Sequence, residues 1–139
     1  MPTRRDVIAL GAAAAALVLA KVHEAVGAQP TIEIVALSHY PVRDALKPVR
    51  DFLGTLGAQV KVVELDAESA AGEKRIKDAG LKGHVPMLLL IDGSDKFKRA
   101  DGTQVEFKDF PAKANNPLGL NGSWTVDDFE AAVNAALGK

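Results

Sequence analysis

The chain has 139 residues, of which 47% are hydrophobic and 25% are charged, and its formal net charge is −1. These values indicate one ordinary globular domain rather than a disordered or fibrous chain. Nearly balanced charge, with no dense basic run beyond the N-terminus, excludes an electrostatic attraction to nucleic acid. The absence of cysteine excludes disulfide bonds, thiolate nucleophiles and cysteine-ligated metals.

The N-terminus has the pattern of a cleavable export signal. Arg4 and Arg5 precede an apolar, alanine-rich run, Val7–Ala20, and the small residues of 26–28 follow it. The apolar run has about 14 residues, too few to cross a bilayer core that needs roughly 20. We therefore predict that residues 1–28 are a signal and that residues 29–139 form the mature domain.

Paired arginines followed by Val7 and Ile8 resemble the twin-arginine export motif. An ordinary Sec signal with two arginines in its positive end is one alternative, and an uncleaved signal acting as an anchor is another. Export by either route predicts a periplasmic or otherwise extracytoplasmic protein, with no stable membrane span after signal cleavage.

Hydrophobic periodicity and turn residues predict alternating strands and helices in the mature domain. A capping box is expected at Thr125 and Asp128, before the last helix. The hairpin is expected to turn through a three-residue loop at 101–103, which sets Phe97 opposite Phe107. The predicted segments are strands at Thr31–Leu37, Gln59–Leu65 and Met87–Ile91, helices at 41–56 and 67–79, a long loop at 110–123 and a last helix from 126. This order predicts an α/β fold with a central mixed sheet flanked by helices.

The order β-α-β-α-β-β-α resembles the thioredoxin fold. The segment 80–93, Gly-Leu-Lys-Gly-His-Val-Pro followed by Met-Leu-Leu-Leu-Ile-Asp-Gly, is similar to the stretch of that family that leads to a cis-proline, here Pro86. In the family, a helix proline lies eight residues after the first active-site cysteine. Pro48 then aligns residues 40–43 with the missing Cys-x-x-C motif. Ile34 stands where the family has a buried acidic residue that assists proton transfer in the redox reaction. This resemblance implies a redox-inactive member of the family.

The resemblance also implies where a binding site would lie. The loop after the first strand and the loop before Pro86 are expected to meet. We therefore expect ligand binding at His39, Tyr40, Arg43, His84, Val85 and Pro86. Arg43 at a helix start suits an anion. Val85 offers backbone groups to an extended partner strand.

Two functions follow from this expectation. The first is an exported, non-enzymatic module that binds a protein or a small ligand at this face. The alternative is a metal-binding or metal-delivery domain in which His39 and His84 hold copper or zinc, with Tyr40 or a water completing the site. The sequence offers no nucleophile candidate, so no catalytic residue is predicted, and weak acid–base activity of Tyr40 or His39 is left open.

Overall fold

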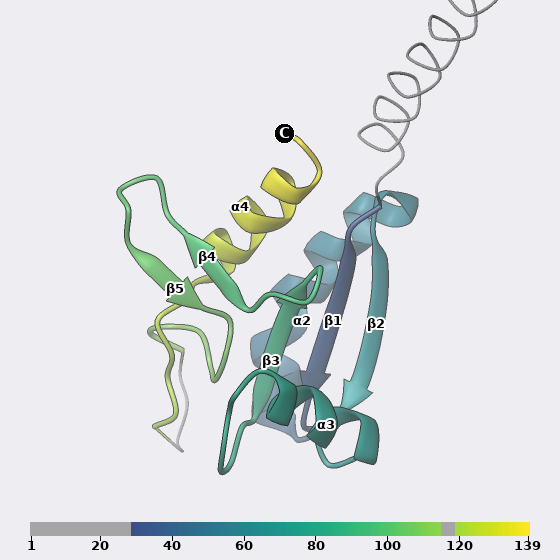
Figure 1. Ribbon diagram of the computed structural model, residues 1–139, viewed down its shortest axis with the longest axis vertical. Coiled ribbons are helices and arrows are strands. Elements are labelled where there is room, and N and C mark those ends of the chain that lie inside the picture. Colours follow the sequence, from purple (N-terminus) through teal and green to yellow (C-terminus); the bar gives the residue numbers. More distant parts are fainter. Residues whose placement is uncertain (1–28, 115–118) are drawn as a thin grey trace, which may run out of the picture.

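The computed structural model describes residues 29–114 and 119–139, so the predicted export signal at residues 1–28 lies outside the described part. Strands and helices alternate before a hairpin and a final helix (Figure 1). Three strands follow α3, where the expected order had two. The elements are β1 (Thr31–Ala36), α2 (Tyr40–Leu56), a 3₁₀ turn (Gly57–Gln59), β2 (Lys61–Asp66), α3 (Ala70–Asp78), β3 (Met87–Ile91), β4 (Lys96–Lys98), β5 (Gln104–Glu106) and α4 (Val126–Ala136).

The main sheet has three strands in the order β2-β1-β3. Strand β1 is parallel to β2 and antiparallel to β3, which confirms the expected mixed α/β architecture. Strands β4 and β5 form a separate antiparallel pair. The chain just after β5 lies beside β3, because the Leu89 N–H donates to the Phe107 carbonyl at 2.8 Å and the Asp109 N–H donates to the Met87 carbonyl at 3.0 Å.

Helices cover both faces of this sheet. In Figure 1, α3 lies in front of β1 and β2 and α2 lies behind the strands. Ile32, Ile34 and Val35 of β1 are fully buried, as expected for a central strand with covered faces. A charged residue, Glu33, is buried in the same strand and accepts a hydrogen bond from the Arg75 side chain of α3 at 2.8 Å.

Helix α2 forms because its apolar residues recur on one face. Its buried side chains are Val42, Leu46, Val49, Leu53 and Leu56, which repeat at three- and four-residue spacing and face the core. A proline sits in its first turn, where no intrahelical N–H is needed. The helix ends at Gly57, whose φ of 53° lies in the region that favours glycine.

The second half of the core is built around Phe107. Its ring makes edge contacts with Trp124 at 5.9 Å and with Phe129 of α4 at 5.5 Å between centroids. Trp124, which follows the long loop predicted at 110–123, is completely buried. Its indole N–H donates to the carbonyls of Lys108 and Asp109, both at 3.1 Å.

The hairpin register differs from the prediction by one loop position. Phe97 lies opposite Val105, and the Arg99 N–H donates to the Thr103 carbonyl, so the loop is 100–102. Phe97 nevertheless stacks on Phe107 with ring centroids 6.2 Å apart. Diagonal neighbours on one face of a strand pair lie within reach of aromatic rings, so the two phenylalanines need not be directly opposite.

None of the helices among residues 29–114 and 119–139 combines the length and the apolar character that crossing a membrane requires.

Candidate functional site

Three segments meet at the end of the sheet where β1 finishes and β3 begins (Figure 1). The Leu37 N–H, just after β1, donates to the Pro86 carbonyl at 2.9 Å, which joins the bases of the two loops. The chain after β5 reaches the same end through its bond from Asp109 to Met87. The expected convergence of the loop after the first strand with the loop before Pro86 is therefore present.

The predicted site residues at the end of the first of these loops and at the start of α2 are all accessible. His39 is the N-cap of α2, but its side chain makes no capping hydrogen bond. Tyr40 is 71% exposed, although it is a large aromatic residue. Arg43 is exposed, and no ion pair engages it among the described residues. Asp44, the next residue, therefore does not pair with Arg43 in the described part of the chain.

The residues predicted on the second loop differ in burial. His84 is exposed, Val85 is half-buried and Pro86 is buried. Among the described residues, no hydrogen bond engages the backbone N–H or C=O of Val85. The peptide bond before Pro86 is trans, since no cis peptide bond occurs in the described ranges. The cis-proline prediction is therefore wrong for this structure.

A groove runs between α2 and the segment after β5, with a volume of about 580 Å³. We call it the α2 groove. Helix α2 contributes Tyr40, Pro41, Asp44, Ala45 and Pro48 to its lining. The facing wall is Phe110, Pro111 and Ala114. Its size falls within the usual range of ligand sites, about 300–1,000 Å³, and its lining is mainly apolar, as in such sites.

A second hollow of about 360 Å³ lies between α3 and the loop before β3. We call it the α3 pocket. His84 and Val85 line it, with Leu37 and Ile76 among its apolar residues and Lys77 among its charged ones. Tyr40 lines the α2 groove, whereas His84 and Val85 line the α3 pocket. The other predicted residues, His39, Arg43 and Pro86, line neither hollow, so the predicted site residues do not share one cavity.

His39 and His84 do not belong to a larger cluster of metal-ligating side chains in the described part of the chain. Within residues 29–114 and 119–139, no group of three or more His, Cys, Asp or Glu side chains could hold a metal ion. His39 also does not line the hollow that His84 lines. The copper or zinc site at His39 and His84 stays a prediction.

Asp109 is a further candidate site residue, and no sequence pattern indicated it. It lies between β3 and the groove wall, at a positive φ of 62°. Burial raises the pKa of its carboxyl above the ordinary value, and the charges of Lys108 and His84 partly oppose that shift. The sequence placed Asp109 only at the edge of a long loop, so nothing there signalled its partly buried position.

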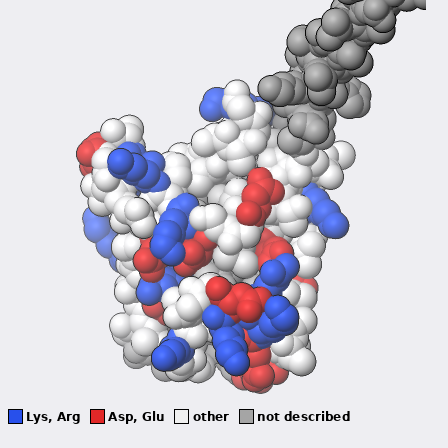
Figure 2. Space-filling view, in the orientation of Figure 1, with Lys and Arg blue, Asp and Glu red and all other residues white. Residues whose placement is uncertain are grey.

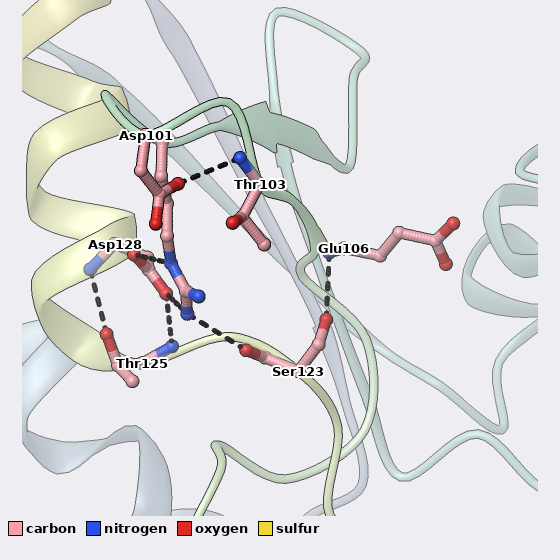
Figure 3. Close-up of polar contacts among 7 residues, drawn as sticks. Asp101, Thr103, Glu106, Ser123, Thr125 and Asp128 are labelled. Atoms are coloured by element: carbon pink, nitrogen blue, oxygen red, sulfur yellow. Dashed lines mark hydrogen bonds and ion pairs between the residues drawn. The ribbon is translucent and has the colours of Figure 1, made fainter.

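Polar contacts fix the C-terminal end of the long loop at 110–123, where it leads into α4 (Figure 3). Asp128 of α4 accepts hydrogen bonds from the Arg99 guanidinium at 2.7 and 2.8 Å and from the Thr125 N–H at 2.9 Å. The Thr125 hydroxyl accepts from the Asp128 N–H, which confirms the predicted capping box. The Ala112 N–H donates to the Trp124 carbonyl at 2.7 Å, so this network also positions the wall of the α2 groove.

Charges on the visible face of the molecule are mixed. Figure 2 shows lysine and arginine side chains interspersed with aspartate and glutamate over α3 and the hairpin. Several of these are ion pairs, such as Lys74 with Asp78 at 2.8 Å. On this face the two signs of charge alternate, so neither sign forms a continuous patch there.

Comparisons with protein-family models, with curated proteins and with solved structures found no match.

Proposed function

We propose that this chain is an exported, redox-inactive module with a thioredoxin-like fold, and that it binds a protein segment or a small ligand at the end of the sheet where Tyr40, Val85 and Phe110 lie. The observation that carries the proposal is the exposed Tyr40 on the wall of the α2 groove. Large aromatic side chains are usually buried or half-buried, so a mostly exposed one beside an apolar groove favours a contact surface.

The thioredoxin-like part of the proposal has support from the sheet and departs from the family at one peptide bond. A central β1 parallel to β2 and antiparallel to β3 is compatible with that fold, as is a proline inside α2. The trans bond before Pro86 is the departure. The absence of cysteine from the whole sequence rules out thiol–disulfide exchange.

Binding rather than catalysis is proposed because the surface offers contact groups. No hydrogen bond from residues 29–114 or 119–139 engages the backbone groups of Val85, which suits main-chain pairing with an extended segment. The α2 groove adds an apolar wall next to Tyr40. Together these features support recognition of a chain or ligand lying across the end of the sheet.

A pull-down from the extracytoplasmic extract of the source cells tests the binding proposal. The bait is the wild-type protein, a Tyr40→Ala/His84→Ala variant or, as a matched control on the outer surface of α3, Lys74→Ala. A partner held by the wild type and the control but lost from the double variant supports the proposal. The same partners on all three proteins contradict it.

Export is tested with the first residues of the chain. Replacing Arg4 and Arg5 by lysine keeps the positive charge that a Sec signal needs but removes the arginine pair. We expect the variant to stay in the cytoplasm while the wild type is found outside it, as measured by cell fractionation. Unchanged export of the variant would show that the signal is of the Sec type.

A further inference from the structure

Tyr40 and Asp44 form a pair on the rim of the α2 groove. They lie four residues apart on α2, and both line the groove. Side chains at this helical spacing are neighbours, with about 5–6 Å between their Cβ atoms. A single bound group can therefore contact the Tyr40 ring and the Asp44 carboxylate at the same time.

The Asp44 carboxylate is available to a ligand. No hydrogen bond or ion pair engages it among the residues that the structure describes. The nearby Lys47 pairs with Asp51, with 2.6 Å between Nζ and Oδ2, and it interacts with Asp44 only through the longer-range attraction of their charges. Asp44 is the one charged residue among the described residues that line the α2 groove. Tyr40 and Asp44 also line a second hollow on α2, and its other lining residues are Arg43, Lys47, Arg50 and Asp51. The complementary ligand group is a cation beside an apolar surface.

The remaining lining favours contact with rings over backbone pairing. Pro41, Pro48 and Pro111 have no N–H to donate, so this groove cannot add a strand through them. Phe110 and Pro111 of the facing wall are buried, so their backbone is packed into the core. The α2 wall from Tyr40 to Pro48 is about 12 Å long at ~1.5 Å per residue, the span of about four extended residues.

We propose that the α2 groove binds an extended segment of a partner protein through an arginine side chain of that segment. The guanidinium stacks on Tyr40 and pairs with Asp44, while neighbouring proline or aliphatic residues of the segment pack on the proline rings. Arginine suits this pair better than lysine, because its planar group stacks on an aromatic face and meets a carboxylate with two hydrogen bonds. The inference rests on the proposed function, since it names the ligand class of one part of that face.

Tyr40 supplies a site-specific readout because it is the only tyrosine in the chain. In protein labelled at tyrosine rings, NMR follows one ring while a peptide is added. The probe is acetyl-Pro-Leu-Arg-Pro-Leu-amide, compared with the same peptide carrying citrulline, which keeps the shape of arginine but has no charge. We expect saturable shifts of the Tyr40 signals, with the arginine peptide binding roughly tenfold more tightly.

Two variants locate the charge effect. Asp44→Asn is expected to weaken the arginine peptide by roughly tenfold and to leave the citrulline peptide unchanged. Asp78→Asn on α3 makes the same change of net charge on the other side of the sheet, and we expect both affinities to stay as in the wild type. Equal affinities of the two peptides, or equal losses in Asp44→Asn and Asp78→Asn, would overturn the inference.

The two proposals fail in different ways. If the arginine peptide does not bind but the pull-down partner is still lost from Tyr40→Ala/His84→Ala, the arginine inference is wrong and the binding module stands. If the peptide binds as expected but every pull-down is unchanged, the groove is a real site and the wider face is not the one that recruits the partner.

Discussion

Replacing Asp128 by asparagine tests the contact that holds the hairpin, the long loop and α4 together. The Asp128 side chain is 11% exposed and accepts three hydrogen bonds, two from Arg99 and one from the Thr125 N–H. Asparagine keeps one acceptor oxygen and loses the charge. Hydrogen bonds to a charged group contribute about 1.5–3 kcal/mol each, and they are not additive.

Part of the stability that these hydrogen bonds provide is kept in the Asp128→Asn variant. Arg99 is one-third exposed and also donates to the Ser123 carbonyl at 3.2 Å, so water and that carbonyl still solvate it. We therefore expect Asp128→Asn to lower the free energy of unfolding by about 2 kcal/mol. For a domain of this size, that corresponds to a fall in Tm of roughly 8 °C.

The pH dependence gives a sharper test. The Arg99 side chain and the Thr125 N–H hold the pKa of Asp128 below its ordinary value. A carboxyl with a lowered folded-state pKa stabilises the protein above its unfolded pKa, near 3.9, and this contribution is lost as the pH falls through the folded pKa. The difference between wild type and Asp128→Asn should be constant from about pH 6 to 8 and shrink below about pH 4.

Urea unfolding followed by circular dichroism, repeated from neutral to acid pH, measures both effects. Asp127→Asn is the matched control, because Asp127 is exposed and belongs to the same first turn of α4. We expect it to cost under about 1 kcal/mol. A loss for Asp128→Asn below about 0.5 kcal/mol, or one that does not change with acid pH, would refute the reasoning.

Three further substitutions and one metal titration test other parts of the structure. Gly72→Ala should destabilise the protein by about 1–3 kcal/mol in urea unfolding, because its Cβ would collide with the backbone carbonyl of Asp66. The Cβ of Gly54→Ala in α2 would meet no atom of the described residues within 4 Å, so this change should instead stabilise the protein by about 0.5–1 kcal/mol. Equal effects of the two glycine substitutions would contradict this expectation. Trp124→Phe removes the indole N–H that donates to the carbonyls of Lys108 and Asp109, and it should lower the free energy of unfolding by about 1–3 kcal/mol. Thermal circular dichroism measures this loss, and an unchanged Tm would argue against those hydrogen bonds. In calorimetric titration, zinc and copper should bind no more tightly than ~10 μM, and tighter binding that His84→Ala abolishes would favour the metal alternative.

Local patterns in the sequence predicted much of the architecture. The apolar run at Met87–Ile91 becomes β3 with the same bounds, because five consecutive apolar residues suit a strand buried on both faces. The capping box at Thr125 and Asp128 forms as expected, since it depends on residues only three apart. Regular spacing of apolar residues likewise predicted α2. Each of these features is decided by neighbours in the chain.

Charged and aromatic details depended on contacts between distant segments. Phe97 stacks on Phe107 diagonally, in a register that the direct pairing rule did not predict. Glu33 is buried in β1 because Arg75, 42 residues away, meets its carboxylate. A charged residue within the apolar run of the first strand indicated that Glu33 needs a partner. The sequence could not show that this partner is Arg75.

The proposed binding face was likewise predicted only in part from the sequence. The sequence by itself determined that thiol chemistry is absent, and it singled out Tyr40 and Val85 near two loops that do meet. Only the tertiary structure decided that His84 lines a different hollow from Tyr40, and that Phe110 and Pro111 face Tyr40 across a groove. Residues about seventy positions apart form that groove, and their approach follows from the packing of the whole core, which no local pattern records.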